Sequence, residues 1–155
     1  MNPNAHKMVV VVAALIEDDR HRLLMVREAQ PEFYGLWNQP AGHVEANESI
    51  MDAFLREAKE ETGHDVRIDG IASIHHFVEA AVLRFNIRAS LLPGEPAPLA
   101  DDVLETGWFS GEELEQMIAD GKLRSKRTEL LTREWLQGGR PQPDLIRTIF
   151  EGSST

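Results

Sequence analysis

Three glutamates near the middle of the chain have the spacing of an acidic stripe along one helix. Glu57, Glu60 and Glu61 are three and four residues apart, and a helix places them within roughly 60° of one line. Like charges at such spacings cost about 0.2 to 0.5 kcal/mol per pair, and burial raises that cost. Arg56 supplies one positive partner for three acids. The remaining deficit fits Mg²⁺, which binds carboxylates and leaves positions for water and phosphate oxygens.

The same run has a simpler interpretation, a solvated acidic helix face, which is the usual fate of Glu-rich segments. The residues one and two turns earlier argue against it. Ile50 and Ala53 project onto nearly the same line as Glu57, and Phe54 lies at its edge. Because this line is apolar near the start of the helix, we expect the acidic stripe to face the protein interior, where a cation would offset its charge.

The residues around the stripe resemble the signature of the Nudix hydrolase family, G-x5-E-x7-R-E-U-x-E-E-x-G-U, in which U is a bulky apolar residue. The match begins at Gly42, continues at Glu48 and ends with the segment 56–63. Every charged and every glycine position agrees with the signature. Ala58 and His64 depart from it, because they occupy the two apolar positions. Both departures concern local packing rather than chemistry.

The resemblance implies an α/β fold, a Nudix-type α/β/α sandwich with a mixed central β-sheet. It also implies an enzyme that cleaves a diphosphate linked to another moiety and uses Mg²⁺ or Mn²⁺. Arg56 would orient a glutamate through a salt bridge, and Glu48 would brace the loop and the helix. The metal ligands implied by the family pattern are the backbone carbonyl of Gly42 and the carboxylates of Glu57, Glu60 and Glu61.

Hydrolysis also needs a base that takes a proton from the attacking water. Glu57 or Glu61 could act from within the signature, whereas some members of the family use an acid from a later loop. Asp101, Asp102 and Glu105 lie in such a loop. We select Asp102 as the loop candidate, although a charge that only keeps the loop soluble is the commoner case for each of the three.

Two further segments, 36–43 and 123–125, resemble a subgroup of bacterial phosphatases in this family. The resemblance implies attack of water on a phosphorus of nucleoside di- and triphosphates or of hydroxymethylpyrimidine pyrophosphate. Trp37 and Asn38 would then stack on and hydrogen-bond to the substrate ring, although a packed tryptophan and a turn asparagine explain them equally well. Two alternatives stay open: an ADP-ribose or nucleotide-sugar pyrophosphatase, and a catalytically silent Nudix domain that binds a nucleotide.

Hydrophobic patterning predicts the elements that must position these residues. The helix that carries the stripe is expected to start at Asn47 or Ser49 and to run to about Thr62, with Gly63 ending it. Strands are predicted at 9–16 and 23–26, joined as a hairpin, and at 66–77, 81–92 and 103–109; helices are predicted at 111–120, 126–137 and 144–150, and a binding loop at 32–42.

Length and composition fit one domain, 1–155, with a flexible tail from about residue 150. The net charge of -10 disfavours a nucleic-acid polymer or an anionic membrane as a partner. The absence of cysteine excludes disulfides and thiolate nucleophiles. The apolar run Val9–Ile16 is too short to span a bilayer and lacks the features of a secretory leader. We therefore expect a cytoplasmic monomer or homodimer whose partner is a small phosphorylated metabolite.

Overall fold

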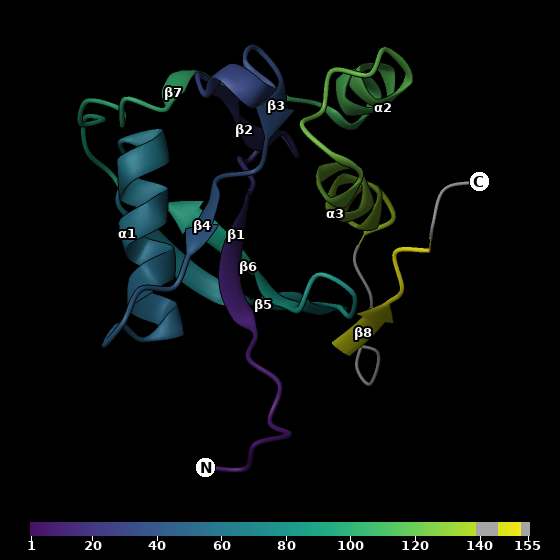
Figure 1. Cartoon of the computed structure of the whole chain (residues 1–155). Coiled ribbons are helices and arrows are strands. Elements are labelled where there is room, and N and C mark those ends of the chain that lie inside the picture. The colour runs from purple at the N-terminus through teal and green to yellow at the C-terminus, as the bar shows by residue number, and fades with distance from the viewer. Residues whose placement is uncertain (139–145, 153–155) are drawn as a thin grey trace.

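The computed structural model of the chain describes residues 1–138 and 146–152. Strands and helices follow one another along it (Figure 1). Their bounds are β1 Val9–Ile16, β2 Leu23–Glu28, the 3-10 helix η1 Pro31–Phe33, β3 Trp37–Asn38, β4 Ala41–His43, α1 Ile50–Thr62, β5 Val66–Phe77, β6 Val82–Leu91, β7 Val103–Phe109, α2 Gly111–Ala119, α3 Lys126–Leu136 and β8 Ile146–Ile149.

The central sheet has the strand order β4-β1-β6-β5-β8. It is mixed, because β1 pairs with β6 and β5 pairs with β8 in parallel, while the other two pairs are antiparallel. A second, antiparallel sheet has the order β3-β2-β7. Helix α1 lies on one side of the central sheet and α3 on the other (Figure 1). This arrangement confirms the predicted α/β/α sandwich with a mixed central sheet.

Strand β1 supplies hydrophobic residues to both faces of the central sheet, because successive side chains of a strand point in opposite directions. Ile16 belongs to a buried cluster with Phe54 of α1. Its neighbour Leu15 belongs to a second cluster, with Leu114 of α2 and Leu131 of α3. The two clusters fix the helices on opposite faces of one sheet.

Helix α1 is held at both ends by the residues that the sequence indicated. The side chain of Ser49 accepts a hydrogen bond from the backbone N–H of Asp52, 3.0 Å away. At the other end Gly63 has φ 76° and donates its N–H to the carbonyl oxygen of Lys59 at 2.9 Å. A Cβ on Gly63 would lie 2.3 Å from the carbonyl oxygen of Ala97, so the position requires glycine. These contacts confirm the predicted end of the helix.

Three predicted features are wrong. Strands β1 and β2 form no hairpin but belong to different sheets, since each pairs with two other strands; an isolated bridge joins Glu17 to Leu23 where the chain turns. The predicted loop 32–42 contains β3 and most of β4. In the predicted helix 144–150, the described part forms strand β8, because the edge of β5 offers backbone partners and β-branched residues favour strands. Residues 144 and 145 lie outside the described residues.

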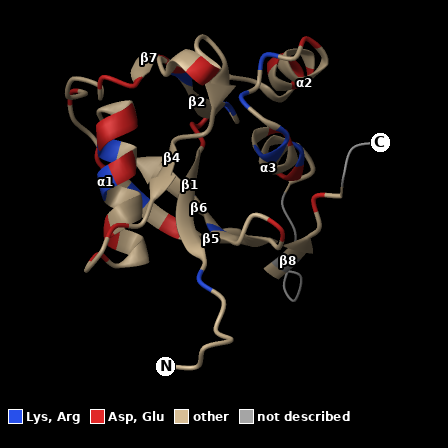
Figure 2. Ribbon diagram, in the orientation of Figure 1, with Lys and Arg blue, Asp and Glu red and all other residues tan. Residues whose placement is uncertain are grey.

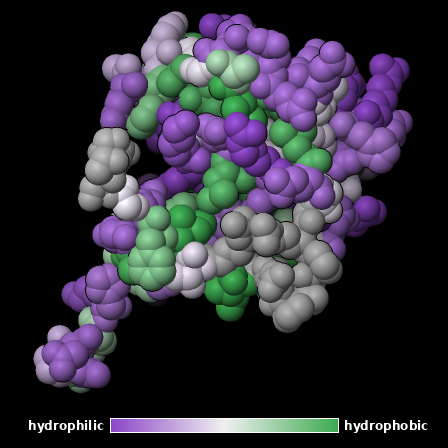
Figure 3. Space-filling model, turned by 90° about the vertical axis from the view of Figure 1, so that its right-hand side faces the viewer, coloured by the Kyte–Doolittle hydropathy of each residue, from purple (hydrophilic) through white to green (hydrophobic). Residues whose placement is uncertain are grey.

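The C-terminal residues that the structure describes are held in place. The backbone N–H of Glu151 donates to the Glu79 carboxylate at 2.9 Å, and the Glu151 carboxylate accepts two hydrogen bonds from Arg127. The flexible tail from about residue 150 stays a prediction, and residues 153–155 of it lie outside the described residues. On the side of the molecule that carries α2 and α3, hydrophilic residues alternate with hydrophobic areas (Figure 3). No helix in the described part of the chain is long and apolar enough to cross a membrane.

Candidate active site

Two glutamates of α1 face strand β4. The carboxylate of Glu61 accepts a hydrogen bond from the backbone N–H of Ala41 at 2.9 Å. The carboxylate of Glu57 packs against the backbone of Gly42, where an added Cβ would lie 2.1 Å from its Cδ and its Oε1. Any side chain at Gly42 would displace Glu57. The glycine and the first glutamate of the signature are thus matched in space.

Arg56 joins the same helix to the loop around it. Its Nε donates to Glu48 at 2.7 Å, and its Nη1 donates to Glu57 at 2.8 Å and to Glu60 at 3.3 Å. Its Nη2 donates to the carbonyl oxygen of His43 at 3.1 Å. The hydrogen bonds to Glu48 raise the pKa of Arg56, and the same contact lowers the pKa of Glu48. One guanidinium therefore fixes α1 to β4 and holds Glu57.

Among residues 1–138 and 146–152, Glu61 has no cationic partner. Burial raises the pKa of Glu61 well above its ordinary value, and the hydrogen bond from the N–H of Ala41 opposes the shift. The charges of Glu57, Asp102 and Glu28 raise it further. Burial also raises the pKa of Glu57, although Arg56 opposes the change. The carboxylates at this place have more negative charge than the protein neutralises.

A cavity of about 670 Å³ borders these glutamates, and its two sides differ in charge. Figure 2 shows acidic residues along α1 and basic residues on α3, across the strands. A volume of this size is typical of small-molecule sites. We call Glu28, Glu57, Glu61 and Asp102 the acidic wall, and Arg84, Arg124, Lys126 and Arg127 the basic wall; Glu45 and Glu151 also line the cavity.

Some charges of the two walls already have partners. Arg124 donates to Glu28 at 2.9 Å and stacks on the ring of Phe33, 4.1 Å from its centroid. Arg127 forms two 2.8 Å hydrogen bonds with Glu151. Since no such pair neutralises Glu61 within the described residues, the cavity suits a ligand that brings a cation to the acidic wall and presents anionic groups.

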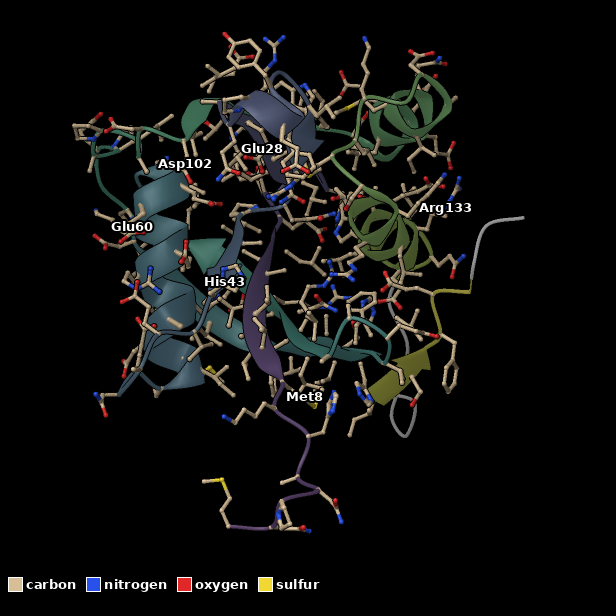
Figure 4. All side chains as sticks on the ribbon, viewed as in Figure 1. Met8, Glu28, His43, Glu60, Asp102 and Arg133 are labelled. Atoms are coloured by element: carbon tan, nitrogen blue, oxygen red, sulfur yellow. The ribbon has the colours of Figure 1, made fainter. Side chains whose placement is uncertain are left out.

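The predicted acids lie at different distances from the cavity. Asp102 borders it, whereas Asp101 is exposed and Glu105 lies 3.6 Å from Arg27. Glu60 is half exposed, at the outer side of α1, while Glu28 and Asp102 lie near the upper end of that helix and β2 (Figure 4). The cavity therefore brings together two of the three stripe glutamates and one loop aspartate.

The two residues predicted to bind a substrate ring have different positions. Asn38 is buried, borders the cavity and accepts a hydrogen bond from the Thr128 hydroxyl at 2.8 Å. Trp37 is absent from the cavity lining and packs edge-on against Phe109, with ring centroids 4.8 Å apart. The position of Asn38 is compatible with contact to a ligand, whereas Trp37 serves packing between β3 and β7.

The metal ligands implied by the signature can be compared with this arrangement. Among residues 1–138 and 146–152, no group of three or more acidic, histidine or cysteine side chains is arranged to hold a metal ion. The reason is that Glu57 and Glu60 are turned onto Arg56, and Glu61 onto the N–H of Ala41. The available donors are oxygens and carry uncompensated charge, so their chemistry fits Mg²⁺.

Sequence reasoning missed Glu28 and most of the basic wall. These residues have no motif of their own and meet across long sequence separations: Glu28 and Arg124 are 96 positions apart. Arg84 left one signal, a charged residue in a strand-like and mainly apolar run from Val82 to Ile87. A charge at a buried strand position requires a partner or a function.

Comparison with known proteins agrees with the site. The NUDIX domain profile matches residues 7–133. The structure of a NUDIX hydrolase from Nitrosomonas europaea is 31% identical, with a TM-score of 0.75, over 95% of this chain and 100% of that one. The chain is 42% identical over 69 residues to CTP pyrophosphohydrolase of Escherichia coli (strain K12), and 36% identical over 85 residues to Phosphatase NudJ of Escherichia coli O1:K1 / APEC.

The two curated alignments cover 44% and 52% of this chain and 51% and 56% of the relatives, so the chain spans about half the length of the curated relatives it matches. The profile match is broader, since residues 7–133 contain every residue of both walls. Glu151, which contacts Arg127, lies outside that match. On the strength of that match, the chain belongs to the Nudix hydrolase family.

Proposed function

We propose that the protein is a metal-dependent pyrophosphohydrolase that acts on nucleoside di- and triphosphates or on hydroxymethylpyrimidine pyrophosphate. The observation that carries this proposal is the uncompensated acidic wall, with the buried carboxylate of Glu61 at its centre, opposite a basic wall in one cavity. The activities for which the relatives are named, those of a CTP pyrophosphohydrolase and of a phosphatase, support a phosphorylated nucleotide as substrate.

The carboxylates of Glu57, Glu60 and Glu61 and the backbone carbonyl of Gly42 would hold Mg²⁺, or Mn²⁺ in its place. The ion would neutralise the charge of the diphosphate and lower the pKa of a bound water. Arg56 keeps Glu57 beside Gly42, so its role is to position a ligand. Glu48 takes no part in the chemistry and anchors Arg56 to the loop.

In the reaction, a water oxygen forms a bond to phosphorus while the bond from that phosphorus to the bridging oxygen breaks. A carboxylate takes the proton of the water. Asp102 is our choice for this base, because it borders the cavity and the other two loop acids do not. Glu57 and Glu61 stay as alternatives. Asn38 borders the same cavity and is the candidate for a hydrogen bond to the substrate ring.

The experiment is a measurement of phosphate and pyrophosphate release from nucleoside di- and triphosphates, hydroxymethylpyrimidine pyrophosphate and ADP-ribose, each with Mg²⁺ and with EDTA. The proposal predicts metal-dependent release from the first three classes. Cleavage of ADP-ribose alone would favour a nucleotide-sugar pyrophosphatase. If every compound stays intact while one raises the melting temperature, the domain is a catalytically silent nucleotide-binding module.

A further inference from the structure

A buried polar row lies behind the basic wall, between the central sheet and α3. The Nη2 of Arg84 donates to His75 Nδ1 at 2.9 Å and to the carbonyl oxygen of Arg127 at 3.1 Å. Because Arg84 can only donate, His75 Nδ1 accepts, and its Nε2–H therefore donates to the Glu134 carboxylate at 2.9 Å. Ser73 donates to the same carboxylate at 3.0 Å. The row fixes the guanidinium of Arg84 from behind.

Arg84 nevertheless keeps one unused donor. Arg84 is 7% exposed and lines the cavity. Within the part of the chain that the structure describes, its enclosed Nε has no hydrogen-bond partner, and neither has the buried Oδ1 of Asn86 on the same strand. Buried donors are nearly always paired, because a donor that loses water without gaining an acceptor costs free energy. Burial and the nearby Arg127 lower the pKa of Arg84 to about 10, so the group stays charged at neutral pH. Arg84 is therefore a buried, fixed cation at the cavity wall whose donors the protein does not fully pair.

The surroundings of Arg84 are also positively charged. Helix α3 begins beside it, and Ser125, Lys126 and Arg127 of that end line the cavity. The N-terminus of a helix carries partial positive charge and favours anions. Arg127 is engaged by Glu151, a carboxylate that also lines the cavity. A protein carboxylate already occupies Arg127, and Lys126 is exposed to solvent, so Arg84 is the buried cation of this wall that has an unpaired donor.

We propose that Arg84 and the first turn of α3 bind a second anionic group of the substrate, a phosphate that is distinct from the phosphorus under attack. This inference rests on the proposed function, in which the acidic wall receives the reacting diphosphate. Without a bound cation that wall repels anions, so a phosphate that reaches the cavity is directed to Arg84. His75 and Glu134 are positioning residues, because they hold Arg84 and do not reach the ligand themselves.

The phosphate could belong to the same polyphosphate chain or to the sugar. In the first case Arg84 would favour nucleoside triphosphates over diphosphates. In the second it would favour a nucleoside 5′-diphosphate that carries a further phosphate on its sugar over the same nucleotide without it. For the substrate whose phosphate Arg84 binds, the Arg84→Lys variant should show a KM raised by about tenfold or more with a smaller change in kcat. In the other pair of substrates, the ratio of the two KM values should change little.

Binding of inorganic phosphate in the presence of EDTA, measured by calorimetry, isolates this site from the metal. The wild-type protein should bind phosphate, and Arg84→Gln and Arg84→Lys should each weaken binding by about tenfold or more, since lysine restores the charge but not the Nε donor. Arg88→Gln is the matched control, because Arg88 follows on the same strand but does not line this cavity. Should Arg84→Gln fail to fold, Arg84→Lys with an unchanged circular dichroism spectrum carries the test.

The outcomes separate this inference from the proposed function. No phosphate binding by the wild type in EDTA, or equal binding by Arg84→Lys, overturns the anion site even when hydrolysis proceeds. Phosphate binding that depends on Arg84 in a protein that hydrolyses nothing with Mg²⁺ keeps the anion site and refutes the proposed function.

Discussion

Substitution of Gly42 by alanine would act on the acidic wall through one atom. The new Cβ would lie 2.1 Å from Cδ and Oε1 of Glu57, whereas ordinary contacts begin at 3.4 Å, so the carboxylate must move by more than about 1 Å. Displacement of a reacting group by about 1 Å lowers the rate by about 10²-fold, which is about 2.7 kcal/mol of transition-state stabilisation. We therefore expect kcat/KM to be lower by about 10²-fold.

The fold should tolerate this change. The displaced atoms form the end of a flexible side chain, and the contact at risk, the ion pair between Glu57 and Arg56, is partly exposed. A pair of this kind contributes about 1 kcal/mol or less to the free energy of unfolding.

The assay for Gly42→Ala is steady-state phosphate release together with thermal unfolding. Gly152→Ala is the control, because a Cβ there meets nothing within 4 Å. A Gly42→Ala protein with wild-type kcat/KM would refute the assignment of Glu57.

Three further substitutions test the acidic wall. Glu61→Gln in EDTA should raise the melting temperature at neutral pH. Since the pKa of Glu61 is raised in the folded state, the free energy of unfolding of the wild type should fall as pH rises from the ordinary pKa of a glutamate to the raised one. Urea unfolding that shows no such fall contradicts the charge deficit. Arg56→Gln should lower the free energy of unfolding by about 1 to 3 kcal/mol, measured by urea unfolding, because Glu48 and Glu57 lose their donor. Asp102→Asn should lower kcat by about 10²- to 10⁴-fold at unchanged melting temperature; an unchanged kcat would assign the base to a signature glutamate.

The helix that carries the glutamates was predictable because its signals are local. Ser49 and Gly63 mark its ends through backbone contacts within a few residues, and the structure has them in these roles. The strands 66–77 and 103–109 have the predicted bounds, because alternation of apolar residues along a strand is also a local property. Local signals therefore account for most of the elements.

The errors arose where distant pairing decides. Apolar residues recur at helical spacing in the segment that forms β8. The edge of β5, about seventy positions earlier, nevertheless gives this segment strand partners. The apparent hairpin failed for the same reason, since β1 pairs with β6 rather than with β2.

The candidate site divides along the same line. Gly42, Glu57 and Glu61 belong to a contiguous signature and lie together in the structure. Arg84 comes from another strand, and its neighbours in the fold, His75 and Glu134, are brought to it by the sheet and by α3. No spacing rule in the sequence links these three residues, so the basic side of the cavity became visible only in the fold.

Metal-dependent hydrolysis at Glu61 is tested most directly by the rate of phosphate release from a nucleoside triphosphate and a nucleoside diphosphate as Mg²⁺ is titrated into wild-type protein and Glu61→Gln. The expected result is a wild-type rate that saturates with Mg²⁺ and vanishes in EDTA, and a Glu61→Gln rate that is lower by about 10²-fold or more at every Mg²⁺ concentration. A wild-type rate that persists in EDTA, or a Glu61→Gln curve that overlays the wild type, would contradict the metal site at the acidic wall.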